Sequence, residues 1–267
     1  MMIEIMKADL QRMFRGKGVY ITFSLFLGIV LLTIFEAGHI GIIIETDTLS
    51  SHSDLDITGF LLTGKEMVFY LMRNTDNILY FILPFIIFIA GADFSSGTAK
   101  NMLISGTSRV TFYLAKLLLA IGCSTFTYCL YLVIPTVFVT IRNGFGGSLN
   151  GEYFFSLIRP FLLQWLLILA VTSVGIFLVF TTKKVATVIS GYLAFLLVPT
   201  LIIMILIGYN EKFINLINYD LVYNMRALGY FSELSSKDIT TSLLMGMGYI
   251  LVSTVGGLLI FRKSEVK

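Results

Sequence analysis

The stretch FLLQWLLILAVTSVGIFLVFTTKKVATVISGYLAFLLVPTLIIMILI, residues 161–207, holds two apolar runs separated only by the polar residues TTKK at 181–184. Each run has about 20 residues, which is the length that an α-helix needs to cross the hydrocarbon core of a bilayer. Strands of a membrane barrel would be shorter and would alternate apolar with polar residues. The two runs therefore predict a tight antiparallel hairpin of membrane-spanning helices.

Four more apolar runs extend this pattern along the 267-residue chain, in which 57% of the residues are hydrophobic and 13% are charged. They cover 19–35, 78–92, a stretch within 112–141, and 239–261, and the first one has an extension to residue 44 that the sequence leaves open. Soluble domains are less apolar and more highly charged. We therefore expect an all-α integral membrane protein with six spans.

The distribution of charge predicts how the spans are oriented. With the N-terminus in the cytoplasm, 12 of the 19 Lys and Arg residues lie on the cytoplasmic side, but only 4 of the 16 acidic residues do. Cytoplasmic loops of membrane proteins are enriched in Lys and Arg. We therefore expect a multi-pass protein of a plasma membrane, bacterial in origin, with both termini in the cytoplasm.

Residues 1–18 carry a helical pattern ahead of the first span. One face collects the apolar side chains, among them Met6, Leu10 and Phe14. Asp9 and the basic residues, among them Arg12 and Arg15, lie elsewhere on the helix. This pattern predicts an amphipathic elbow helix that lies in the inner membrane interface. It acts either as a lipid anchor alone or as an anchor that also touches a cytoplasmic subunit. The remaining residues, 19–267, form the membrane domain.

Two long segments, 45–77 and 208–238, fall on the outer side. The second is too polar to span a membrane and too apolar for a solvated loop, because Asn and Tyr alternate with Leu, Ile and Met. Short re-entrant helices before the last span reconcile these features. They either cap a translocation path, with Tyr219, Asp220 and Tyr223 at an outer gate, or only pack over the bundle.

Other chemistry is sparse. Glu36 and His39 share a helical face near the outer end of the first span, where they form either a substrate or proton site or an ordinary interfacial pair. With only two histidines and no CxxC pair, a metal site is not expected. Lys116 lies close enough to the inner end of its span to extend to the headgroups. An ion-driven transporter needs intramembrane charge, so this pattern argues against that class.

One motif imitates a nucleotide-binding loop. Residues 59–66, GFLLTGKE, follow G-x-x-x-x-G-K but end in Glu66 where the loop needs a Ser or Thr hydroxyl for Mg²⁺. The carboxylate would also repel phosphates. We therefore expect no ATPase, no catalytic site and no cofactor in this chain.

The polar, basic stretch GADFSSGTAKNMLISGTSRVTFYLAK, residues 91–116, joins the second and third spans. It contains an acid-x-x-x-Gly-Thr pattern, Asp93 to Gly97 and Thr98, followed by Ser108-Arg109 and Lys116. With the elbow and six spans, this layout resembles the membrane subunits of ABC type-2 exporters, such as bacitracin, lantibiotic and other drug exporters. That family more often has Glu in the place of Asp93 and Pro in the place of Gly106.

The resemblance implies that the connector, residues 93–111, holds a coupling helix that docks on a separate ATP-binding subunit. Its docking residues would be Asp93, Gly97, Thr98, Lys100, Met102, Leu103 and Arg109. Ser95, Ser96 or Thr98 would cap the helix, and Arg109 would pair with a partner acid or with Asp93. The alternative is a basic loop solvated at the headgroups.

The resemblance further implies a permease that works as a homodimer or with a second permease, beside two copies of an ATPase subunit that bind ATP and Mg²⁺. Membrane lipid is expected as a partner and nucleic acid is not. The compact outer segments suggest export of an amphipathic peptide, an antimicrobial or a lipid-like molecule, which would confer antimicrobial resistance. The alternatives are an ion-coupled secondary transporter and a non-transporting membrane sensor or immunity protein.

Overall fold

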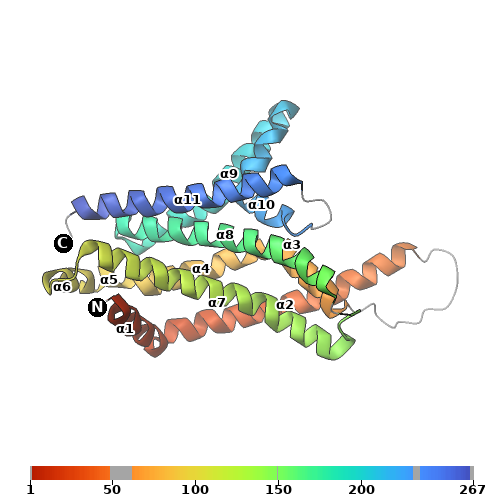
Figure 1. The fold of residues 1–267 in the computed structure, drawn as a ribbon, viewed down its shortest axis with the longest axis horizontal. Helices are drawn as coiled ribbons and strands as arrows, with labels where there is room; N and C mark the ends of the chain where they lie inside the picture. Colours follow the sequence, from red (N-terminus) through yellow and green to blue (C-terminus); the bar gives the residue numbers. More distant parts are fainter. Residues whose placement is uncertain (1, 49–61, 149, 231–234, 265–267) are drawn as a thin grey trace.

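The computed structural model of the protein describes residues 2–48, 62–148, 150–230 and 235–264, without the side chains of residues 36–48 and 152. Secondary structure in these residues is helical throughout, which confirms the all-α class for them. The long helices form a bundle, and both ends of the chain reach the same end of it (Figure 1). We call this end, which also holds residues 92–104, the connector end, and the opposite one the distal end.

Six stretches of the described residues are long and apolar enough to cross a membrane, as expected. They are α2 (Lys17–Thr48), a broken stretch over 75–95, α7 (Arg109–Asn143), α8 (Gly151–Thr182), α9 (Val185–Tyr209) and α11 (Ser236–Lys263). The lengths and apolar compositions of these helices are those of a multi-pass membrane protein. The helix α2 runs past Glu36 and His39, and the stretch within it that is apolar enough to cross a membrane covers Lys17–Phe35.

The predicted hairpin of the fourth and fifth spans is confirmed. Only Lys183 and Lys184 separate α8 from α9, and Lys183 reverses the chain with a left-handed φ of 56°. α9 then diverges from the bundle toward the distal end (Figure 1). Its buried residues, Val188, Tyr192 and Leu196, all lie in its first half.

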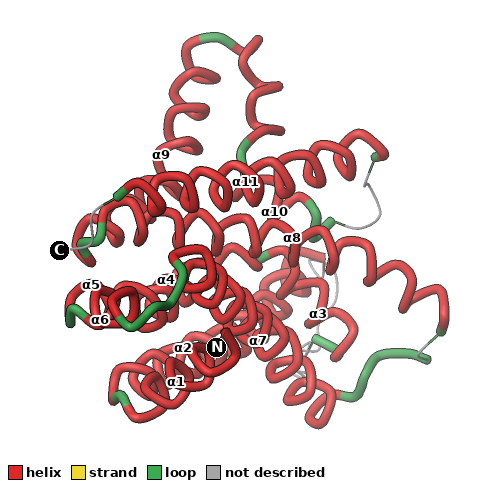
Figure 2. Tube along the Cα trace, turned by 60° about the vertical axis from the view of Figure 1, so that its left-hand side comes forward, coloured by secondary structure: helices red, strands yellow, loops and turns green. Residues whose placement is uncertain are grey.

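α8 lies at the centre of the bundle, and α11 packs along it (Figure 2). Small residues allow the close approach, as expected for a membrane bundle. A Cβ atom at Gly246 would lie 2.8 Å from Leu166 Cγ, and one at Gly257 would overlap the Tyr113 hydroxyl. Gly248, in the same helix, faces open space.

The second span is broken into short pieces. Residues Thr75–Ile78 form the 3₁₀ turn η1, Leu79–Ile86 form α4, Ile87–Gly91 form the π-helical turn η2, and Ala92–Ser95 form α5. Pro84 has no N–H and so interrupts the α-helical hydrogen bonds just before η2. Gly97, with φ 71°, then turns the chain into the connector helix α6 (Thr98–Ile104).

A helix forms over the predicted elbow segment as α1 (Met2–Arg15), which ends at a turn around Gly16. The face against the bundle consists of Ile5, Asp9 and Met13, at helical spacing, whereas Leu10 and Phe14 are exposed. Asp9 lies off the exposed side that carries Leu10 and Phe14, and it is buried against the bundle, where cations of the chain surround its carboxylate.

Short helices also form at the distal end. α3 (Gly64–Arg73) begins at Thr63 with a capping box that uses Glu66, so the nucleotide-loop-like residues 62–66 form a helix start. Residues 59–61 lie outside the described residues. Before the last span, η3 (Glu211–Tyr219) and α10 (Leu221–Ala227) form the short helices that the sequence predicted.

Candidate functional site

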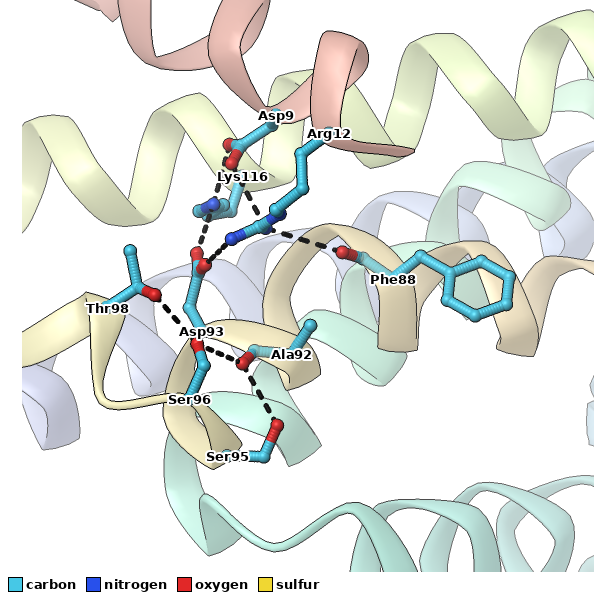
Figure 3. A network of polar contacts seen from close by, with 9 residues as sticks. All are labelled: Asp9, Arg12, Phe88, Ala92, Asp93, Ser95, Ser96, Thr98 and Lys116. Atoms are coloured by element: carbon cyan, nitrogen blue, oxygen red, sulfur yellow. Dashed lines mark hydrogen bonds and ion pairs between the residues drawn. The ribbon is translucent and has the colours of Figure 1, made fainter. Parts of the chain in front are cut away.

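Four charged side chains meet at the connector end of the bundle (Figure 3). Asp9 and Arg12 come from α1, Asp93 from α5 and Lys116 from α7. Lys116 Nζ lies 2.6 Å from Asp9 Oδ2 and also pairs with Asp93. Arg12 pairs with Asp93 and lies 3.2 Å from Asp9. We call these four residues the charge cluster.

The charge cluster is buried and balanced. The side chains of Lys116 and Asp93 have 0% exposure, Asp9 has 6% and Arg12 has 38%. Two acids face two bases, so the cluster has no formal net charge, which is what allows these ions to leave water. The expectation that Lys116 extends to the headgroups is therefore wrong: it turns inward because two carboxylates receive it.

Local sequence explains how three separate elements reach one point. Asp9 and Arg12 are three residues apart, so they share a face of α1. The π turn η2 adds a residue per turn and changes the direction in which Asp93 points. Gly18 admits the Phe88 ring, because a Cβ atom there would lie 2.7 Å from it. The corner between α1 and α2 therefore fits closely against η2.

Burial and the neighbouring cations act in opposite directions on the pKa of the Asp9 carboxyl. Burial raises the pKa of the Asp9 carboxyl above its usual value, and the nearby Lys116 ammonium offsets only part of this rise. The neighbouring Asp93 carboxylate raises that pKa further, and Arg12 lowers it. The residues present can hold α1, α5 and α7 together by charge.

The connector helix α6 presents only part of its predicted docking face. Lys100 and Ile104 are exposed, Ile104 to 75%, and so is Asn101, which sequence reasoning missed. Met102 and Leu103 are instead half-buried against the core. Helical spacing alone explains the division, because positions 100, 101 and 104 lie on one side of a helix.

The predicted capping of α6 is wrong. Gly97 is its N-cap and no side chain caps it, while Thr98 Oγ1 lies 2.7 Å from the Ser96 hydroxyl. The hydroxyls of Ser95 and Ser96 both donate to the carbonyl of Ala92, the first residue of α5. A left-handed Gly97 therefore fixes the angle between α5 and α6.

Arg109 has a role that the sequence did not indicate. Its Nη1 atom donates to the carbonyl oxygens of Phe261 at 3.0 Å, Arg262 at 2.8 Å and Ser264 at 2.7 Å. These belong to the last turn of α11 and the residue after it, where carbonyls lack helical partners. The suggested pairing with Asp93 is wrong, because Asp93 pairs with Arg12 and Lys116.

An aromatic cluster also packs at the connector end. Phe94, Phe112, Phe180 and Phe261 come from α5, α7, α8 and α11, and their ring centroids lie 4.7 to 6.3 Å apart. Edge-to-face packing of such rings adds to the free energy of burial. The connector end therefore joins α1, α5, α7, α8 and α11 through charges, a capped helix end and aromatic packing.

The predicted outer-gate residues are divided. Asp220 is buried, caps α10 through the Val222 N–H, and accepts a hydrogen bond from Thr200 at 2.6 Å. Tyr219 and Tyr223 are exposed to 64% and 40%. Glu36 and His39 lie in α2, but their side chains fall outside the described residues.

Sequence reasoning missed Gln164, the polar hub of the distal half. Its Nε2 donates to the carbonyls of Met72 at 2.7 Å and Met225 at 2.8 Å. Its Oε1 accepts from the hydroxyls of Tyr128 at 3.1 Å and Thr75 at 3.2 Å. One amide on α8 thus links α3, α7, η1 and α10, and a buried polar residue amid an apolar span was the available signal.

In the part of the chain that the structure describes, no group of three or more His, Cys, Asp or Glu residues is placed to hold a metal ion. Neither protein-family models nor curated proteins give a match to this chain.

Proposed function

We propose that this chain is the membrane-spanning permease subunit of an ATP-driven exporter, with the ATP hydrolysed by a separate subunit that docks at the connector end. The observation that carries the proposal is the charge cluster. It joins the connector to the elbow α1 and to the span α7 through buried ion pairs. A force on α6 would therefore move these elements together.

In this mechanism, the partner contacts the exposed side of α6 when ATP brings two ATPase subunits together. Because α5 and α6 are fixed to α1 and α7, the displacement passes to the spans instead of being lost in a flexible loop. The helix bundles of two permease chains, identical or similar, then open a path toward the outside. The proposed cargo is an amphipathic peptide, an antimicrobial or a lipid-like molecule.

The positive-inside distribution of Lys and Arg supports a cytoplasmic connector end. In that orientation, the distal helices α3 and α10 lie on the outer side, and η3 packs mainly along α9. They would be displaced when the path opens outward.

An ion-coupled transporter is the second candidate, and the charge cluster itself favours it. Asp93 and Lys116 are buried ionisable residues within apolar spans, which the sequence was expected to lack. Their close pairing with Asp9 and Arg12, at one end of the bundle, leaves them poorly placed to exchange protons along a path. We therefore place ATP-driven transport first.

The experiment is purification of the full chain from native membranes in mild detergent, followed by reconstitution in lipid vesicles. We expect an ATP-binding subunit to accompany the chain, and a fluorescent amphipathic peptide to move only when ATP is hydrolysed. An ionophore that collapses the ion gradient should leave this transport unchanged. Transport that survives ATP depletion but stops with the ionophore would instead establish the ion-coupled alternative.

A further inference from the structure

Basic side chains predominate among the charges that remain exposed at the connector end. The acids Asp9 and Asp93 are buried within the charge cluster, whereas Lys100 on α6 and Arg262 and Lys263 at the end of α11 are exposed. Glu4 on α1 is the exposed acid of this end among the described residues. The side of the bundle formed by α6 and the end of α11 therefore presents positive charge.

Arg109 holds the two parts of this surface at a fixed separation. It begins α7 directly after the connector, and its guanidinium binds the backbone carbonyls of Phe261, Arg262 and Ser264. Phe261 beneath it packs against Phe94 of α5 with ring centroids 6.3 Å apart. The end of α11 is thus a fixed neighbour of the connector.

We infer that α6 and the last turn of α11 form one two-part docking surface, which binds an acidic face on the ATP-hydrolysing partner. Lys100 and Ile104 are contacts on the first part, and Arg262 and Lys263 are contacts on the second. Arg109 is a positioning residue, since its donors are used within the chain. This inference rests on the proposed function and adds the C-terminal turn to it.

A protein partner fits α6 better than a lipid surface does. The exposed positions from 100 to 106 include one large apolar side chain, Ile104, among Lys100, Asn101, Ser105 and Gly106. An interfacial helix needs a broad apolar face. α1 has one, since Ile3, Leu10 and Phe14 are all exposed beside its basic residues. An acidic groove with one apolar pocket matches the surface of α6.

The test places a photo-crosslinking amino acid at position 100, 262 or 142 of the full chain in its native membrane. Position 142, normally Arg142, lies exposed at the distal end and is the control. We expect positions 100 and 262 to crosslink to the same polypeptide, identified by mass spectrometry as one that binds ATP. A crosslink from position 100 alone would overturn the inference and leave the proposed function standing.

Three further outcomes separate the docking surface from the proposed function. If position 262 crosslinks only to phospholipid, the end of α11 faces the membrane and the inference is wrong. If neither position crosslinks and the purified chain carries no ATP-binding subunit, the proposed function fails. If that subunit is retained without either crosslink, only the docking surface proposed above fails.

Charge reversal gives a second measurement. Arg262→Glu with Lys263→Glu should lower retention of the ATP-binding subunit by about tenfold and weaken the dependence of that retention on salt. Arg142→Glu with Lys237→Glu makes the same charge change at the distal end and should have no effect. Arg109→Gln should weaken the crosslink from position 262 more than that from position 100. Equal loss at both positions would contradict its positioning role.

Discussion

Lys116 of α7 and Asp9 of α1 form a buried ion pair of 2.6 Å, although 107 positions separate them in the chain. α1 precedes the first span, so this pair fixes the elbow to the third span. Asp93 completes the link from the connector. The elbow, the connector and the third span therefore behave as one mechanical unit.

Lys116→Met should be strongly destabilising. It removes the cation that Asp9 and Asp93 share, and an unpaired buried carboxylate costs about 3–5 kcal/mol. We expect a lower midpoint of thermal unfolding in detergent. Lys116→Arg, which keeps a cation between the two carboxylates, should lose less stability than Lys116→Met. An equal loss in both variants would mean that shape, and not charge, decides the site.

Asp9→Asn should change how stability depends on pH. The folded-state pKa of Asp9 is raised by burial, so its protonation stabilises the folded chain. That contribution is present below the unfolded pKa and is lost as the pH rises through the folded value. Unfolding midpoints measured from about pH 4 to pH 7 should show this loss in the wild type and not in Asp9→Asn. Identical profiles for the two proteins would contradict the assignment.

Gly18→Ala should disturb the corner between α1 and α2. The added methyl group would overlap the Phe88 ring, and overpacking of this kind costs about 1–3 kcal/mol. A disulfide-trapping pair across α1 and α5 should then form more slowly. Phe88→Leu in the same chain should restore the rate. Gly28→Ala, at a glycine with no neighbour within 4 Å, is the matched control and should have no effect.

Gln164→Leu should loosen the distal end. The change leaves two hydroxyls and two carbonyls without the buried amide, and each unsatisfied group costs about 1–3 kcal/mol. Hydrogen exchange should accelerate in α3 and α10 and stay unchanged in α6. Thr172→Val, which removes a buried hydroxyl that bonds to Ser124, is the control and should leave α3 and α10 protected. Protection of both helices in Gln164→Leu would show that the amide does not hold them.

The spans could be predicted because they depend on local composition. Each long apolar run is helical, although the second is broken into η1, α4, η2 and α5, and the two residues Lys183 and Lys184 form the turn between α8 and α9 as expected. The short helices η3 and α10 followed from a segment of intermediate polarity. The role of each connector residue could not be predicted from the sequence. Met102 packs against the core and Arg109 binds the end of α11, and both contacts depend on residues that are distant in the chain.

The sequence alone determined the helical class, the number of spans and the elbow, since hydrophobicity and helical periodicity act over neighbouring residues. Only the tertiary structure decided which charges are buried together. Arg12 and Asp93 lie 81 positions apart, and Arg109 and Phe261 lie 152 positions apart. No local pattern encodes such pairs. The energy of a buried charge depends on its neighbours in space, and folding brings those neighbours from distant parts of the chain.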